Sequence, residues 1–170
     1  GGRRDLPAAT LGGAIYVFGG YGGGLSANTN VYRYDGTSWT QVTGLPEGRN
    51  AAFAATLGEY IYVMGGNDPS WTTTTNVWRF DGTNWTETAS LPAARRNLAA
   101  AELDGHLYAI GGDSTSTSLT NVFVYPGTET VTGVMPSSGA CTGGSSGVVT
   151  GTNFGNGTGI TNGTPCGGEA

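Results

Sequence analysis

Few residues in this 170-residue sequence have the chemistry that catalysis or metal binding needs. The single histidine, His106, has no second histidine to join in a metal site and no nucleophile placed beside it, so neither a metal triad nor a serine-histidine-aspartate arrangement can be assembled. Asp68 and Asp113 lack the spaced carboxylate series of a calcium loop and are interpreted as solvated turn residues. We therefore predict no metal, no cofactor and no catalytic site in this segment.

The cysteines and the glycosylation sequons bear on location. Cys141 and Cys166 are too few to fill the four-ligand shell of structural zinc, so they form a disulfide or remain two unrelated thiols. Three asparagines begin an Asn-x-Thr sequon, namely Asn84, Asn156 and Asn162. These features favour an extracellular or cell-surface location, whereas free thiols would favour an intracellular adaptor.

The composition indicates an all-β protein. The chain contains 32 glycines, which disfavours helices because each interior glycine costs about 1 kcal/mol, and 10% aromatic residues supply apolar faces to bury. The net charge is -5 and the seven basic residues are scattered, so nucleic acid is excluded as a partner class. No apolar run approaches the roughly 20 residues of a membrane helix, and we expect no membrane insertion in this segment.

An internal repeat organises most of the chain. The string IYVFGG at 15–20 returns as IYVMGG at 61–66 and LYAIGG at 107–112, a step of 46 residues each time. The same step relates Arg3 to Arg49 and Arg95, Trp39 to Trp85, and the Leu-Pro pair at 45–46 to the pair at 91–92.

Each repeat contains four short strand patterns bounded by turn residues. In the second repeat they cover about 51–57, 60–66, 76–80 and 85–88. The Asp81-Gly82 pair between the last two favours a type I′ hairpin, which needs positive φ at both central positions. We predict a four-stranded antiparallel meander in each repeat.

These motifs resemble the kelch repeat, in which an Arg follows a Leu-Pro turn, an aromatic strand ends in Gly-Gly, and a Trp closes the unit. The resemblance covers about residues 3–125 and implies part of a β-propeller, whose ~4 to 8 blades surround a channel. Residues 1–128 are assigned to kelch repeats, with blades at about 3–46, 47–92 and 93–128. Three blades cannot close a ring, so the chain is expected to be a fragment whose partners include the remaining blades. Blade faces left uncovered predict self-association or aggregation.

The third repeat departs from the pattern because PGTETVTGV stands where the other repeats read DGTxWT. Its fourth strand is expected to be absent. One hypothesis is that the third repeat is the last blade of the ring and takes its fourth strand from the N-terminus of the parent protein.

The tail at 129–170 changes to a composition rich in Gly, Ser and Thr. It resembles the opening of a TIG/IPT domain through Pro136-Ser137-Ser138-Gly139 and Gly151-Thr152-Asn153-Phe154-Gly155. That resemblance implies a truncated immunoglobulin-like β-sandwich. The alternative is a disordered linker.

The predicted meander places the long connections at 21–29, 67–75 and 113–120 on one face of the propeller, together with the links between repeats. Trp71 has no aromatic counterpart in the other repeats, and Arg49, Arg95 and Arg96 lie in the links on that face. We predict that these four residues bind a partner. The alternatives are that Trp71 folds over its own blade and that the arginines bond neighbouring loop carbonyls.

These observations predict a non-enzymatic module that binds a protein or a glycan, from a secreted or cell-surface kelch/TIG protein. Two alternatives remain open. The chain could be a fragment of a kelch-propeller enzyme, galactose-oxidase-like or a sugar isomerase, whose catalytic residues lie elsewhere. It could also come from an intracellular kelch adaptor.

Overall fold

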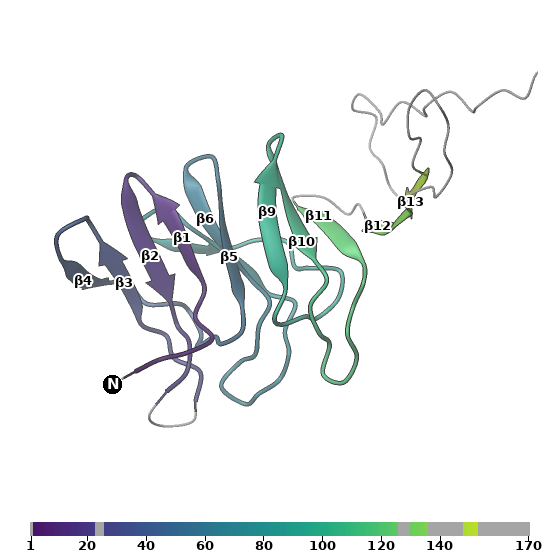
Figure 1. The fold of residues 1–170 in the computed structure, drawn as a ribbon. Coiled ribbons are helices and arrows are strands. Elements are labelled where there is room, and N and C mark those ends of the chain that lie inside the picture. The colour runs from purple at the N-terminus through teal and green to yellow at the C-terminus, as the bar shows by residue number, and fades with distance from the viewer. Residues whose placement is uncertain (1, 23–25, 126–129, 136–147, 153–170) are drawn as a thin grey trace, which may run out of the picture.

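The computed structural model describes residues 2–22, 26–125, 130–135 and 148–152. Within these residues the chain forms thirteen β-strands and no helix. The strands make three antiparallel sheets in which chain neighbours are also sheet neighbours, and each of the first two sheets is one complete repeat (Figure 1). The predicted all-β fold with a meander in each repeat is confirmed.

Blades 1 and 2 have the same construction. Blade 1 consists of β1 (Ala8–Leu11), β2 (Ala14–Phe18), β3 (Val31–Tyr34) and β4 (Trp39–Val42). Blade 2 consists of β5 (Phe53–Leu57), β6 (Tyr60–Met64), β7 (Val77–Phe80) and β8 (Trp85–Glu87). The registers agree as well, because Phe18 pairs with Val31 and Met64 pairs with Val77, each pair one repeat apart.

The Asp-Gly hairpins differ from the predicted type I′ turn. Positive φ occurs at Gly36 and Gly82 only, and each loop has four residues, because Tyr34 pairs with Trp39 and Phe80 with Trp85. The aspartate explains the longer loop. The Asp81 carboxylate accepts the backbone N–H of Thr83 at 2.8 Å and of Asn84 at 2.7 Å, which satisfies two donors that the turn leaves unpaired.

Blade 3 contains β9 (Ala99–Leu103), β10 (His106–Ile110) and β11 (Val122–Tyr125). The expected absence of its fourth strand is wrong, since β12 (Thr130–Met135) pairs with β11 through Val122–Val131 and Phe123–Thr130. The alternation of β-branched residues in TVTGV suffices for a strand without the DGTxWT motif. With this edge occupied, a strand supplied from elsewhere is not needed. β13 (Val148–Thr152) pairs with the far edge of β12.

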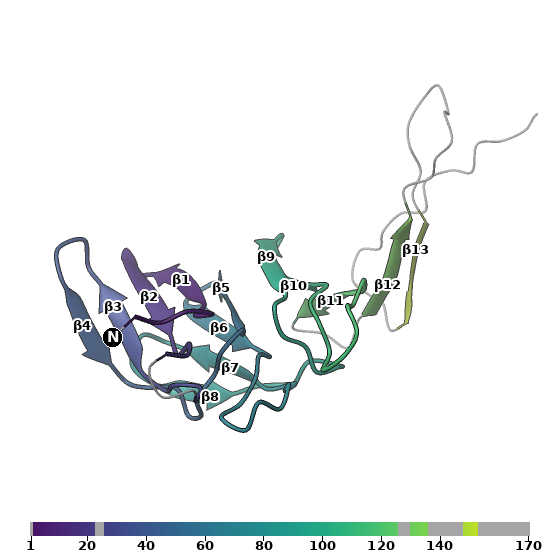
Figure 2. The same cartoon turned by 60° about the horizontal axis from the view of Figure 1, so that its bottom comes forward.

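The blades stand side by side around their first strands. β1 contacts β5, and β5 contacts β9, while the later strands of each sheet fan outward (Figures 1 and 2). This is the arrangement of consecutive propeller blades. The immunoglobulin-like domain predicted for 129–170 stays a prediction, and most of that range lies outside the described residues.

Two apolar layers, here called seam 1 and seam 2, hold the blades together. Seam 1 places Tyr16 and Phe18 of blade 1 against blade 2, where the Phe18 ring meets the edge of Phe80 at 6.3 Å and of Trp85 at 5.7 Å. Seam 2 places Tyr62 and Met64 of blade 2 against Leu107 and Phe123 of blade 3. Because alternate residues of a strand point to opposite faces, β6 supplies both seams and is apolar throughout.

The Gly-Gly pairs that end β2 and β6 allow neighbouring blades to approach. Gly65 and Gly66 have φ of +60° and +84°, which side chains with a Cβ rarely adopt. A Cβ at Gly65 would also collide with the Arg95 carbonyl oxygen, which belongs to the segment leading into the next blade. The repeated glycines are therefore explained by backbone contact between blades.

A chain of backbone hydrogen bonds links the repeats at the entry to each first strand. Ala51 N–H donates to the Asp5 carbonyl at 2.8 Å, and Asn97 N–H donates to the Ala51 carbonyl at 2.9 Å. These three residues, one repeat apart, share a positive φ of 51° to 55°. One link per blade thus fixes the register of each blade against the next.

Candidate functional site

The long connections gather on one face of the molecule, here called the loop face. They are the β2–β3, β6–β7 and β10–β11 connections together with the β4–β5 and β8–β9 links, and the tight turns lie at the opposite ends of the strands (Figure 1). The predicted placement of the adaptable loops on one face agrees with this topology. The loop face is the part of the rigid scaffold where side chains are free to vary.

Two of the four predicted binding residues lie inside the molecule. The Arg49 and Arg95 side chains are 0% exposed, and their guanidinium groups lie over Trp78 at 4.4 Å and over Phe123 at 3.9 Å. Arg95 donates to the Gly111 carbonyl at 2.8 Å and to the Asn121 side chain at 3.1 Å. Burial lowers the pKa of Arg95. A partner cannot reach either group, so both are excluded from the contact surface.

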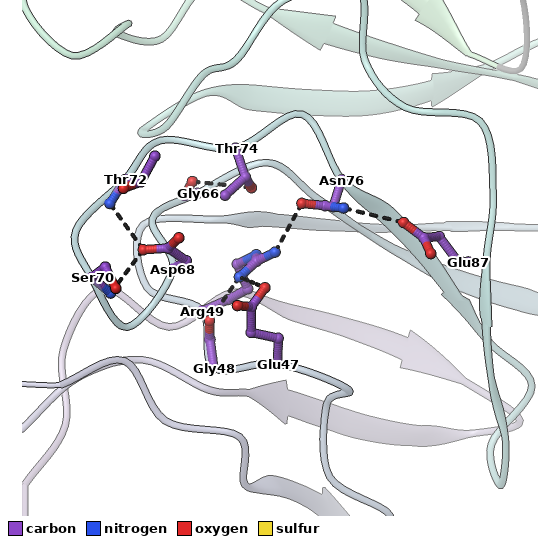
Figure 3. Close-up of polar contacts among 10 residues, drawn as sticks. All are labelled: Glu47, Gly48, Arg49, Gly66, Asp68, Ser70, Thr72, Thr74, Asn76 and Glu87. Carbon is purple, nitrogen blue, oxygen red and sulfur yellow. Dashed lines mark hydrogen bonds and ion pairs between the residues drawn. The ribbon is translucent and has the colours of Figure 1, made fainter.

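Arg49 is the centre of a polar network that crosses seam 1 (Figure 3). It donates to the Glu47 carboxylate at 2.9 Å and to the Asn76 side-chain oxygen at 3.1 Å. The Asn76 amide in turn donates to Glu87 at 3.1 Å. The network joins the link after blade 1 to the outer strands of blade 2, which gives Arg49 a positioning role.

Arg96 differs from Arg95 in being only partly buried. Its backbone forms a bridge with Asp113, and the pKa of Asp113 is lowered mainly by hydrogen bonds from the Asn97 amide and the Ser118 hydroxyl, with a smaller contribution from the Arg96 charge. Arg96 thus remains on the loop face but is engaged by its own blade.

Trp71 is the predicted residue that the structure leaves most available. Its side chain is 45% exposed, and its backbone takes a positive φ of 64° within a loop organised by Asp68. The Asp68 carboxylate accepts the N–H groups of Ser70 at 2.8 Å and Thr72 at 2.9 Å (Figure 3). This fixed loop holds Trp71 out from blade 2 instead of letting it fold over its own sheet.

Trp71 contacts two residues that the sequence analysis did not select. Its ring meets the edge of Tyr21 at 5.2 Å, and the Arg4 guanidinium lies over the other part of this row, 4.4 Å from the Tyr21 ring centre. The Arg4 side chain is 69% exposed. Arg4, Tyr21 and Trp71, here called the aromatic row, therefore connect blades 1 and 2 on the loop face.

A recurrent backbone bridge places this row. The paired positions are Arg4 with Tyr21, Asn50 with Asn67, and Arg96 with Asp113, each one repeat after the previous pair. The backbone geometry is therefore repeated while the side chains change from one blade to the next. Such variation within a constant frame is the sequence signal that could have identified Arg4 and Tyr21.

The remaining predicted residues are separate from the row. Asn84 is exposed in the β7–β8 hairpin, where its amide donates to Asp81 at 3.3 Å. His106 is exposed at the start of β10, with its ring Nδ1 3.0 Å from the Asp104 carbonyl oxygen. The other two sequons, at Asn156 and Asn162, and both cysteines, Cys141 and Cys166, lie outside the described residues.

Two searches of the described ranges returned nothing. No group of three or more His, Cys, Asp or Glu side chains in them is close enough to hold a metal ion. Nor does this part of the chain contain a helix with the length and hydropathy for crossing a bilayer.

Stacked four-stranded meanders with Gly-Gly strand ends define a β-propeller architecture. Comparison with protein families adds that the Kelch motif model matches residues 2–46, 48–92 and 94–125. The chain belongs to the kelch-repeat family, whose repeats generally mediate protein binding. No curated protein matches the chain.

Proposed function

We propose that this chain is a non-enzymatic recognition module that captures a protein partner through the aromatic row on its loop face. The observation that carries the proposal is the joint exposure of Arg4 and Trp71 on either side of Tyr21. An exposed tryptophan supplies a large apolar anchor, and an exposed guanidinium supplies a charge-assisted donor for a carboxylate. The partner segment is thus expected to combine an acidic side chain with an apolar one.

The row is pre-organised for binding. The Asp68 loop fixes the backbone of Trp71, and the backbone bridge between Arg4 and Tyr21 fixes the other end with hydrogen bonds of 3.0 and 2.9 Å. Little conformational freedom remains to be lost when a partner binds, which favours affinity from a small surface. The guanidinium, phenol and indole groups support binding and supply no nucleophile or general base for turnover.

The test is capture of peptides from an array of acidic and neutral sequences, with and without an aromatic or aliphatic residue. Trp71→Ala is expected to reduce capture of acidic-apolar peptides at least tenfold while leaving the urea midpoint unchanged. Trp39→Ala is the matched control, because Trp39 is also exposed, at 53%, but lies on β4 away from the row. Equal capture by both variants and the parent chain would contradict the proposal.

A glycan partner is the second outcome that the experiment distinguishes. An indole ring also stacks on sugars, so the same variants are applied to an array of neutral and acidic oligosaccharides. Binding there, lost in Trp71→Ala and absent from the peptide array, would assign the row to carbohydrate instead.

The proposed location is the cell surface or the secreted medium. Asn84, exposed in a hairpin loop, is the sequon within the described residues. Expression through a eukaryotic secretory pathway should add a glycan that Thr86→Ala removes. An unchanged mass in the parent chain would count against this location.

A further inference from the structure

We propose that two copies of this chain pair head to tail, with the free face of blade 1 in one copy receiving the free face of blade 3 in the other. The two seams within the chain show how one blade receives another. Each terminal blade carries one half of that same interface without a neighbour in the described structure.

The receiving half is on blade 1. A pocket of about 210 Å³ opens there and is lined by Arg3, Leu6, Val17, Gly19, Tyr32 and Trp39. One repeat later, the same positions are held by Arg49, Ala52, Val63, Gly65, Trp78 and Trp85, which lie in or beside seam 1. The pocket is thus the seam position of blade 1 without the blade that would fill it.

The pocket arginine keeps its seam geometry. Arg3 lies 5.3 Å from the Tyr32 ring centre and donates to the Gly19 carbonyl at 3.4 Å. Arg95 makes the corresponding contacts in seam 2 at shorter distances, 3.9 Å to the Phe123 ring and 2.8 Å to the Gly111 carbonyl. The receiving side is therefore arranged for a blade but packed less tightly.

The inserting half is on blade 3. Phe18 and Met64, which fill seams 1 and 2, are 0% exposed, whereas Ile110 at the same repeat position is 42% exposed. Leu103 occupies the position of Leu11 and Leu57, both of which pack against a seam, and it is 58% exposed. Blade 3 thus presents the apolar side chains that blade 1 is shaped to receive.

The backbone supports the same pairing. The hydrogen-bond chain runs from Asn97 to Ala51 to Asp5, which leaves the Asp5 N–H at one end and the Asn97 carbonyl at the other. Contact between the two faces brings these ends together and adds one more link of the existing kind. The continuation of an interface already used twice is what commits the proposal to a second copy.

Head-to-tail contact closes only if the rotations sum to a full turn. Two copies with three blades each give six blades, within the ~4 to 8 that propellers contain. Both junctions would then be identical, and no apolar blade face would remain open.

The test measures the mass of the full chain in solution by light scattering at low and high micromolar concentration. We expect a pair, twice the chain mass of 17.2 kDa. Trp39→Glu breaks the receiving face and Ile110→Glu breaks the inserting face, so each variant alone should be monomeric. Mixing them restores one intact junction and should regenerate a pair.

Several results would overturn the proposal. These are a monomeric parent chain, a mass that grows without limit, a pair that survives both substitutions, or a mixture that stays monomeric although both variants keep the circular dichroism of the parent. Trp71→Ala is the control on the loop face and should remain paired. Because this substitution tests the recognition proposal separately, failure of one proposal is distinguishable from failure of the other.

Discussion

The three arginines at positions 3, 49 and 95 occupy the same place in three repeats and differ in their surroundings. Arg49 and Arg95 are completely buried between blades, whereas Arg3 borders an open pocket. The difference teaches that a neighbouring blade, and not the repeat motif itself, decides whether this side chain is a buried positioning group or a surface group. Recognition is left to positions such as Arg4 and Tyr21, where the repeats differ.

The largest expected effect comes from removing the seam arginine. Arg95→Ala should lower the free energy of unfolding by about 1–3 kcal/mol, because the Gly111 carbonyl and the Asn121 side chain lose a buried donor. Arg3→Ala should change it by less than about 0.5 kcal/mol in the monomer, as surface substitutions usually do. Urea unfolding at a concentration where the chain is monomeric measures both. Equal effects would show that burial does not separate the two positions.

A smaller effect distinguishes the hairpin ends from the seams. Backbone N–H groups of Ser38 and Thr37 lower the pKa of Asp35 from its ordinary 3.8, and those of Asn84 and Thr83 do the same for Asp81. The folded chain therefore holds these protons less strongly than the unfolded chain. Stability should be constant above the ordinary pKa and fall as the pH drops through it.

The double substitution Asp35→Asn and Asp81→Asn tests the hairpin contribution. Asparagine keeps an oxygen for the two backbone donors but cannot titrate, so the fall in urea midpoint between about pH 6 and about pH 3 should become smaller. Asp113 remains in the variant, and part of the fall should therefore persist. An unchanged pH profile would show that the hairpin carboxylates do not contribute.

Much of the fold follows from the sequence because it depends on local signals repeated in register. The Gly-Gly pairs, the alternation in 60–64 and the Asp-Gly turns predict the strands and their order. β12 was missed because it lacks the motif of the other repeats and forms a strand on β-branched alternation alone. The predicted type I′ turns were wrong because the aspartate binds backbone donors and lengthens the loop.

The candidate site was less predictable. Trp71 could be selected as an aromatic without a counterpart, but its contact with Tyr21 depends on how loops from two blades meet. The burial of Arg49 and Arg95 likewise depends on tertiary packing, because charged residues in loops are ordinarily exposed. Sequence therefore identified the face and one anchor, while the partners of that anchor required the fold.

The central claim is that each repeat is stabilised by packing against the next one. A double-mutant cycle with Phe18→Leu and Trp85→Leu tests it most directly, because these residues come from different blades and meet only in seam 1. The account predicts a coupling free energy of about 0.5–1.5 kcal/mol in urea unfolding. Additive effects of the two substitutions would contradict it.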